Sequence, residues 1–374
     1  MARALPHQPV AAAGSRTRRD LRPSLQAAFT RQPGGRPEGT QAMSHIFAAA
    51  AVPPTVPDVT DALAHAAAAA TRAPSIHNTQ PWRWQVGDAC LDLYLDRRRQ
   101  LDHTDPLARL AILSCGAALH HARTALTGGG WRVEVVEFPD PADPDHLAHI
   151  SVYDRASASP EALRRVRAMR ERHTDRRPVT ATPVGGDVLL AVTVAAEEYG
   201  WLRELPRDRV VELGSAMTYA QRAEVDDDRW RAELAYWAGG TRPDRAGVPD
   251  AAIPDRPTQT AVPSRDFGYP GALAVGTGHD LNATYAILYG PEDTPVDWLR
   301  AGQALSAAWL TATELGVSLL PMSAAVEVPA ARLVLRRLLS GIGQPYLVLR
   351  LGIADPAAVP PTTPRLDPQQ IIGD

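Results

Sequence analysis

The spacing of hydrophobic residues predicts helices alternating with short strands from about residue 58 onward. Residues 58–72 and 106–126 repeat apolar side chains at helical spacing, and Asp58 or Thr60 is placed to cap the first of these helices. Pro74 ends that helix. Short segments that favour strands are 82–86, 91–95, 131–138 and 149–153.

A similar order returns about 190 residues later, which indicates an internal duplication of a whole unit. Residues 297–315 form a second long apolar helix, and 317–320 and 345–351 are predicted strands. We therefore expect an α+β fold with two fused halves, 43–160 and 161–374, that form an intramolecular pseudo-dimer. Each half would have an antiparallel sheet, with the two long helices packed together at the centre.

Residues 226–271 interrupt this order with a long segment rich in Pro and Gly. The segment contains Trp230, Tyr236 and Trp237 and separates two predicted helices. Loops of such length are usually functional lids or disordered linkers. The aromatic residues favour a lid, and a disordered linker is the alternative.

The first 42 residues are rich in Arg, Pro, Gly and Gln and show no hydrophobic period, which predicts disorder. Their seven Arg residues face only Asp20 and Glu38, so this segment is strongly basic. Met43 opens a more ordinary sequence. We expect Met43 to be the true translation start.

Charge and composition exclude several classes of function. The net charge of −3 argues against a nucleic-acid partner. No apolar run reaches the roughly 18 residues of a membrane span, and residues 1–42 lack the apolar core of a secretory signal, so we expect a cytoplasmic protein. The two cysteines, Cys90 and Cys115, stand in apolar contexts and are expected to be core residues.

All 39 basic residues are Arg, because the chain contains no lysine. This excludes a pyridoxal-phosphate Schiff base and a P-loop lysine. A phosphate would have to be held by Arg, backbone N–H groups or hydroxyls, and the planar guanidinium fork of Arg suits that role.

Residues 74–82 join a helix to a strand through small and polar side chains. Such a turn can aim Ser75 and Asn78 at a polar ligand. The alternative is an ordinary turn that connects a helix to a strand. His77 is either a ligand or base, or a hydrogen-bonded structural residue.

Residues 172–178 place Arg172, Thr174 and Arg176 at alternate positions. An extended backbone would put all three on one face, where two guanidinium groups and a hydroxyl could clamp a phosphate. The alternative is a solvated arginine cluster. Pro321-Met322 and Arg365, near the end of the chain, indicate nothing by themselves.

Together these segments resemble the FMN-dependent nitroreductase family. Residues 74–82 match the family's Pro-Ser-x-x-Asn-x-Gln-Pro-Trp segment at every fixed position, and 172–176 resembles its Arg-x-Ser-x-Lys/Arg phosphate clamp. The resemblance covers about residues 58–370 and extends to the tandem Acg type, in which one chain imitates the usual dimer. Because each half holds one of the two motifs, the chain could complete one flavin site.

The resemblance implies that FMN contacts Pro74, Ser75, Ile76, Asn78, Arg172, Thr174, Arg176, Pro321, Met322 and Arg365. Pro321-Met322 would back the isoalloxazine ring, and Arg365 would add a phosphate contact to the clamp. No catalytic side chain is implied, because the flavin carries the hydride chemistry.

The implied function is that of an oxidoreductase that uses NAD(P)H to reduce nitro or quinone-type compounds. Ser323-Ala324 stands where the family often has Glu-Gly, which removes a carboxylate near the flavin. The alternative is therefore a protein that stores FMN under a lid formed by Trp230, Tyr236 and Trp237. A third class, an interaction protein without flavin, is disfavoured by the two intact motifs. The expected ligand is a small molecule, and no metal is implied. The chain could act as a monomeric pseudo-dimer, and further oligomerisation is the alternative.

Overall fold

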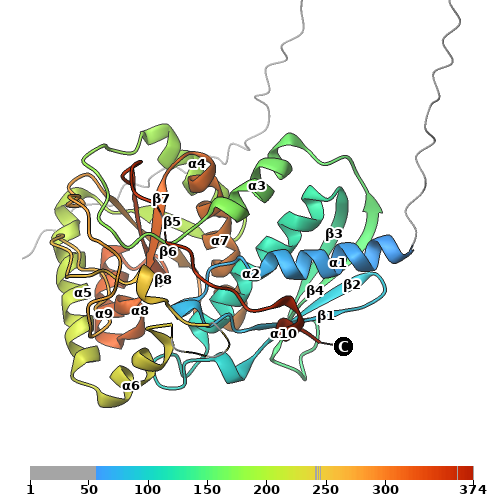
Figure 1. Cartoon of the computed structure of the whole chain (residues 1–374), viewed down its shortest axis with the longest axis horizontal. Helices are drawn as coiled ribbons and strands as arrows, with labels where there is room; N and C mark the ends of the chain where they lie inside the picture. Colours follow the sequence, from blue (N-terminus) through green and yellow to red (C-terminus); the bar gives the residue numbers. More distant parts are fainter. Residues whose placement is uncertain (1–55, 241, 243, 245, 360, 374) are drawn as a thin grey trace, which may run out of the picture. The chain divides into compact units, whose positions relative to one another are not determined.

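The computed structural model describes residues 56–240, 242, 244, 246–359 and 361–373 (Figure 1). The predictions for residues 1–42 and Met43 lie outside this part of the chain. The helices are α1 (Val56–Ala70), α2 (Arg109–Gly128), α3 (Pro160–Glu171), α4 (Gly186–Ala196), α5 (Val210–Val225), α6 (Asp228–Trp237), α7 (Pro295–Glu314), α8 (Ala324–Glu327), α9 (Pro329–Leu338) and α10 (Pro368–Ile371). None of the helices in the described ranges has both the length and the apolar character needed to cross a membrane.

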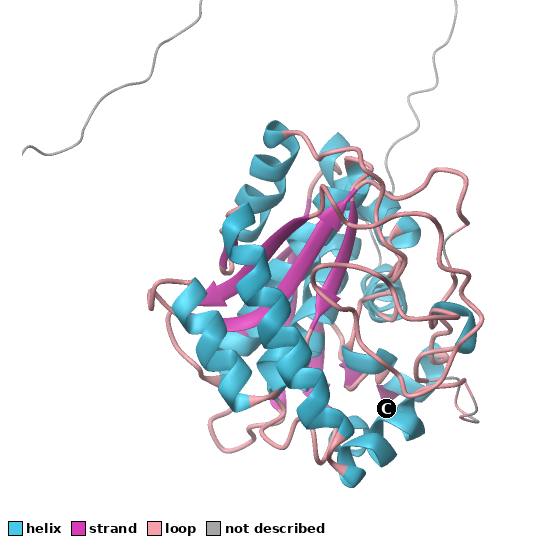
Figure 2. Cartoon of the chain, turned by 90° about the vertical axis from the view of Figure 1, so that its left-hand side faces the viewer, coloured by secondary structure: helices cyan, strands magenta, loops and turns pink. Residues whose placement is uncertain are grey.

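The strands form two sheets. Figure 2 shows strands in magenta packed against the helices in cyan. Sheet A has the order β3-β4-β2-β1-β9, and sheet B has the order β5-β6-β8-β7. Every neighbouring pair is antiparallel except β1 with β9. The strands are β1 (Trp82–Val86), β2 (Cys90–Leu95), β3 (Trp131–Glu137), β4 (His146–Arg155), β5 (Trp201–Glu204), β6 (Thr284–Gly290), β7 (Ser318–Met322), β8 (Gln344–Gly352) and β9 (Ile372–Gly373).

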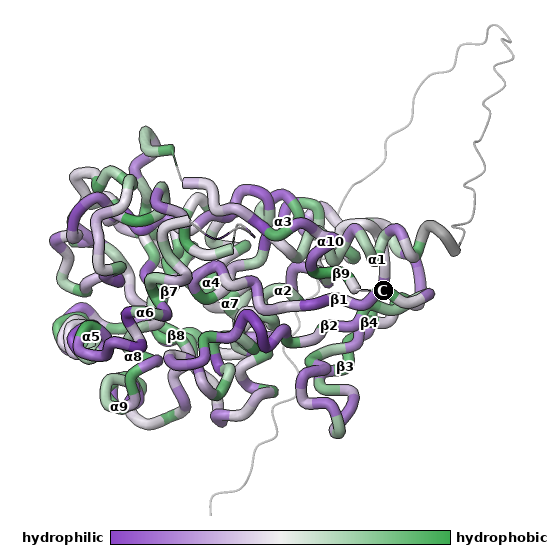
Figure 3. Tube along the Cα trace, turned by 60° about the horizontal axis from the view of Figure 1, so that its bottom comes forward, coloured by the Kyte–Doolittle hydropathy of each residue, from purple (hydrophilic) through white to green (hydrophobic). Residues whose placement is uncertain are grey.

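The two sheets differ in how deeply they are buried. Along β2 buried and half-buried residues alternate, so this strand has one core face and one outer face. In contrast, β8 is buried along nearly its whole length and carries mostly hydrophobic residues (Figure 3). Sheet B therefore forms the more enclosed wall beside the central helices.

The centre of the molecule is the contact between α2 and α7. Gly116 and Gly302 lie at this contact, where a Cβ on Gly116 would be 3.1 Å from the Cα of Gly302 and 2.9 Å from the carbonyl carbon of Leu299. Only glycine allows two backbones to approach this closely. The predicted α+β fold, with antiparallel sheets and two long central helices in contact, is confirmed.

The C-terminal segment returns to the first half of the chain. After β8 it runs past the first half to α10, and β9 then pairs parallel with β1 through Trp84 and Ile372 (Figure 1). Leu366 and Ile371 are buried in the main core. The proposed division at 160/161 falls at the start of α3, but the last strand completes the sheet of the first half.

Two helices begin at other residues than the sequence predicted. Helix α1 begins at Val56, so neither Asp58 nor Thr60 is its cap. Helix α2 begins at Arg109, later than the predicted residue 106, because the carboxylate of Asp105 accepts hydrogen bonds from the N–H groups of Leu110 and Ala111, both 2.9 Å.

Candidate functional site

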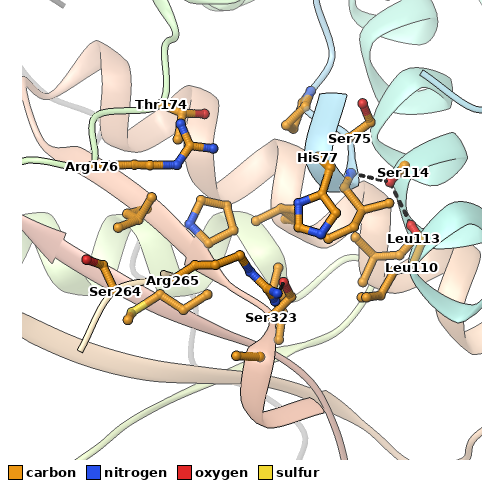
Figure 4. A pocket seen from close by; sticks show the side chains of 18 of the residues that line it. Ser75, His77, Leu110, Leu113, Ser114, Thr174, Arg176, Ser264, Arg265 and Ser323 are labelled. Atoms are coloured by element: carbon orange, nitrogen blue, oxygen red, sulfur yellow. Dashed lines mark hydrogen bonds between the residues drawn. The ribbon is translucent and has the colours of Figure 1, made fainter. Parts of the chain in front are cut away.

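The main cleft lies between the two halves and has a volume of about 860 Å³, including space that opens to solvent. This size is within the range of small-molecule sites, roughly 300–1,000 Å³. Figure 4 shows its polar residues facing one another from several elements. It is lined by Pro74, Ser75, Ile76, His77, Leu110, Leu113, Ser114, Thr174, Arg176, Met217, Ser264, Arg265, Phe267, Leu305, Trp309, Leu320, Pro321, Met322, Ser323, Ala324 and Leu347.

The 74–82 turn enters this cleft as a tightly held single turn of 3-10 helix (Ile76–Asn78). The Oγ of Ser114 in α2 accepts a hydrogen bond from Ile76 N at 3.0 Å, and the Oγ of Ser75 accepts one from Gln80 N at 3.0 Å. His77 and Asn78 have positive φ angles of 43° and 56°. Non-glycine residues in this region are strained, and such strain is typical of functional sites.

Asn78 itself does not line the cleft. Its Nδ2 donates to the carbonyl oxygens of Gly247 at 2.9 Å and Pro364 at 3.0 Å, and its Oδ1 accepts from Nη1 of Arg365 at 3.2 Å. Asn78 therefore connects the turn with both the 226–271 segment and the C-terminal segment.

The clamp residues separate into two groups. Thr174 and Arg176 line the cleft, and Nη1 of Arg176 donates to the carbonyl oxygen of Ala252 at 3.0 Å. Arg172 lies behind the wall, with its guanidinium 4.4 Å from the ring centroid of Trp309. Residues 172–176 form a loop instead of a strand, so alternation does not hold all three side chains on one cleft-facing side.

The loop is positioned by a buried arginine of sheet B. Nη2 of Arg350 in β8 donates to the carbonyl oxygens of Asp175 at 3.1 Å and Arg177 at 2.7 Å. Nη1 of the same side chain is 3.0 Å from Oδ2 of Asp280, which neutralises its charge. The clamp is thus fixed by the rigid strand beneath it.

Arg172 is buried and Arg365 is half-buried, and neither makes an ion pair to a carboxylate within the described residues. Nε and Nη1 of Arg172 and Nε of Arg365 are buried without a hydrogen-bond partner. Burial, followed by the charge of Arg365, lowers the pKa of Arg172 to about 9. Burial, followed by the charge of Arg72, lowers the pKa of Arg365 to about 10. Both side chains stay protonated at pH 7, so this region can stabilise a bound anion.

Two further residues set the charge inside the cleft. Arg176, whose pKa is lowered to about 10 by burial and then by Arg265, is still cationic at pH 7. Burial, then Arg265 and Arg176, hold the pKa of His77 well below its usual value. His77 is therefore a neutral group that lies across the cleft from Arg176 and Arg265 (Figure 4).

Pro321 and Met322 form part of an apolar wall with Leu320 and Leu347. Strand β7 extends through Met322, beyond the predicted end at residue 320, so both residues are held by hydrogen bonding to β8. The polar Ser323 follows at the start of α8. A flat apolar wall beside polar groups suits an aromatic ring system with a polar edge.

The 226–271 segment contributes to the cleft through residues other than the predicted aromatic ones. Trp230 is buried in a small cluster with Leu234 and Phe267, Trp237 joins the main core, and Tyr236 is 59% exposed. None of the three aromatic residues lines the cleft. The segment is folded, which excludes a disordered linker for its described residues, and it lines the cleft with Ser264, Arg265 and Phe267.

Side-chain contacts of Arg265 hold this segment over the cleft. Its Nη2 is 2.5 Å from Oε1 of Glu327 and 3.2 Å from Oγ of Ser323, and its Nη1 is 3.4 Å from Oε2 of Glu224. Burial raises the pKa of Glu224 to about 8, despite the attraction of Arg265. No motif marks Arg265 or Ser114 in the sequence.

Known proteins with similar sequences align with most of the chain. "Putative NAD(P)H nitroreductase Rv3131" of Mycobacterium tuberculosis is 38% identical over 310 residues, covering 80% of this chain and 88% of that protein. "Putative NAD(P)H nitroreductase acg" of the same organism is 33% identical over 305 residues, covering 79% and 90%. No family model matches the chain.

Among solved structures, the FMN and NADPH-dependent nitroreductase NfnB of a Sphigopyxis strain aligns with 56% of this chain and 97% of its own, at 16% identity and a TM-score of 0.37. That likeness is too low to support an inference. The two mycobacterial relatives exceed 30% identity over nearly their whole length, and on that basis the chain belongs to the NAD(P)H nitroreductase family.

Proposed function

We propose that the cleft binds one FMN and that the protein uses NAD(P)H to reduce nitro or quinone-type compounds. The observation that carries this proposal is the set of buried guanidinium N–H groups without partners, Nε and Nη1 of Arg172 and Nε of Arg365, which lie behind the cleft wall. A phosphate group would supply the missing charge and acceptors. The chain's membership in the NAD(P)H nitroreductase family supports the same reading.

In this proposal each group of residues has a separate task. Arg172, Arg176 and Arg365 hold the phosphate, with Thr174 as a hydroxyl partner. Ser75 and Ile76 offer polar and backbone groups to the ribityl chain or ring edge, and Asn78 holds their turn in place. FMN, when bound, supplies the hydride-transfer chemistry, and the protein supplies orientation and electrostatics.

The cleft wall formed by Pro74, Pro321 and Met322 would exclude water from one ring face. The neutral His77 and the cationic Arg265 would face the polar edge of the ring (Figure 4). Cations at this edge stabilise negative charge that develops on reduction. This arrangement can act without a carboxylate at the position of Ser323.

Anaerobic spectroscopy tests the proposal. The purified chain should show flavin absorbance with one FMN per chain, and NAD(P)H should bleach it. Reoxidation by a nitroaromatic or quinone compound should restore the colour. Protein that stays colourless after incubation with excess FMN and desalting would contradict the binding site.

The alternative function is FMN storage, and the Arg265 contacts favour it. Arg265 makes a buried ion pair with Glu327 and a hydrogen bond to Glu224, and these contacts hold the 226–271 segment over this side of the cleft. Opening of such a cover can limit the rate of turnover. Bound FMN that NAD(P)H bleaches only after Arg265→Met would support storage, whereas rapid bleaching of the unmodified chain would contradict it.

A further inference from the structure

A second cluster of polar side chains lies on the outer face of sheet A. Asp92 in β2 is directly opposite His149 in β4, and Cys90 precedes Asp92 by two residues, so it shares the same face. Leu91 and Leu93 point to the other side and are fully buried. None of the three polar residues lines the cleft.

The burial of Cys90 differs from the sequence prediction. Both cysteines were expected in the core, and Cys115 is indeed buried, but Cys90 is half-buried. The apolar residues around Cys90 alternate with it along the strand and occupy the opposite face. Its thiol therefore points toward the polar face of the sheet.

Three different donor atoms meet at this face. Sγ of Cys90, a carboxylate oxygen of Asp92 and a ring nitrogen of His149 all lie within 4.8 Å of one another. Tetrahedral zinc, with Zn–S near 2.3 Å and Zn–N or Zn–O near 2.0–2.2 Å, separates its ligand atoms by about 3.3–3.7 Å. Shifts of about 1 Å, which side-chain rotation supplies, reach that geometry.

A fourth residue holds the carboxylate in place. Nε2 of His146 and Nδ1 of His149 each lie 2.7 Å from Oδ1 of Asp92. The ring of His146 is also stacked on Tyr94, with ring centroids 4.5 Å apart. A carboxylate ligand that is oriented by a second imidazole is a common outer-shell arrangement in metal sites.

The cluster is sheltered but open to an ion from solvent. The side chains of His146, Asp92 and His149 are 14%, 17% and 32% exposed. The ligands stand on two paired strands, so their backbone positions are fixed before any ion binds.

We propose that Cys90, Asp92 and His149 bind a zinc ion, with His146 as the residue that positions Asp92. Sulfur, nitrogen and oxygen donors together suit Zn²⁺, whereas Mg²⁺ and Ca²⁺ select oxygen ligands. On binding, the thiol of Cys90 releases its proton to solvent and its sulfur coordinates as thiolate. Water fills the remaining position, and the ion links β2 to β4.

Cobalt provides the probe, because a Co²⁺–thiolate bond gives a near-ultraviolet charge-transfer band. Chelator-treated full-length protein titrated with Co²⁺ should develop this band to saturation at one ion per chain, and Zn²⁺ should abolish it by displacement. Cys90→Ser should lose the band, and the matched control Cys115→Ser should keep it. Zn²⁺ should raise the melting temperature of the unmodified chain and leave that of Cys90→Ser unchanged.

The two histidines separate ligation from positioning. His149→Ala should weaken Zn²⁺ binding more than 100-fold by calorimetry, and His146→Gln should weaken it by about 10- to 100-fold at unchanged stoichiometry. Absence of saturable binding below about 1 mM, or a cobalt band that survives Cys90→Ser, would overturn the site. The melting temperature of each variant without added metal reports folding, so a failure of the FMN proposal leaves this test unaffected.

Discussion

The glycine contact between α2 and α7 gives a prediction whose magnitude follows from the structure. Replacing Gly116 by Ala puts a Cβ 2.9 Å from the carbonyl carbon of Leu299 and 3.1 Å from the Cα of Gly302, and the Leu299 carbonyl oxygen is closer still. Non-bonded carbon atoms prefer about 3.5–4.0 Å. All three neighbours are backbone atoms, so no side-chain rotation relieves the clash, and the helices must separate by roughly 1 Å.

Overpacking of this kind destabilises a protein by about 1–3 kcal/mol. At about 2–4 °C per kcal/mol, we expect Gly116→Ala to lower the melting temperature by roughly 2–12 °C. Leu113 and Leu305, from the same two helices, line the cleft, so flavin content should fall as well. Differential scanning calorimetry and flavin absorbance of the purified protein measure both effects.

Two further variants make the experiment decisive. Gly186→Ala is the matched control, because a Cβ there meets nothing within 4 Å, and its melting temperature should stay equal or rise slightly. The double variant Gly116→Ala/Gly302→Ala should lose less than the sum of the single losses, since the first substitution already separates the helices. If Gly116→Ala melts at the same temperature as Gly186→Ala, the close helix contact is refuted.

Three other predictions concern charge and the C-terminal segment. Arg172→Ala should weaken FMN binding by about 10- to 150-fold, because a charge-assisted hydrogen bond contributes roughly 1.5–3 kcal/mol, and fluorescence titration that finds unchanged affinity would contradict the phosphate assignment. The pKa of Glu224 is about 8 in the folded chain and lower when unfolded, so folded protein binds the extra proton and its stability should fall as pH rises from about 4.5 to 8. Glu224→Gln should flatten this dependence in melting curves, and parallel curves for both proteins would disprove it. Deleting residues 361–374 removes β9 and Arg365, so the shortened chain should lose FMN and melt at a lower temperature; a shortened chain with normal flavin content would show that the segment is dispensable.

The sequence predicted the central helices and most strands because their hydrophobic period is long and regular. The resemblance to the nitroreductase family implied that Pro74, Ser75 and Ile76 share one site with Thr174, Arg176, Pro321 and Met322, and the structure places these residues around one cleft. Pro321 and Met322 could be included only through the resemblance, because they indicate nothing by themselves.

Residues whose neighbours are distant in the chain could not be placed in this way. Arg265 meets Glu224 and Glu327 only through tertiary packing, and no local pattern marks the three as a network. Trp230, which was predicted to cover the ligand, instead packs with Leu234 and Phe267. This packing removes its apolar ring from water within its own segment. Composition alone cannot distinguish an aromatic residue that covers a ligand from one that forms a small core.

The contacts of Asn78 with the C-terminal segment have a consequence for folding during translation. Asn78, near the beginning of the fold, is held by the carbonyl of Pro364 and the guanidinium of Arg365, which follow it by 286 and 287 residues in the chain. A nascent chain on the ribosome can form both central helices and still lack these anchors. The turn at Asn78 therefore gains these contacts only after Pro364 and Arg365 have left the ribosome.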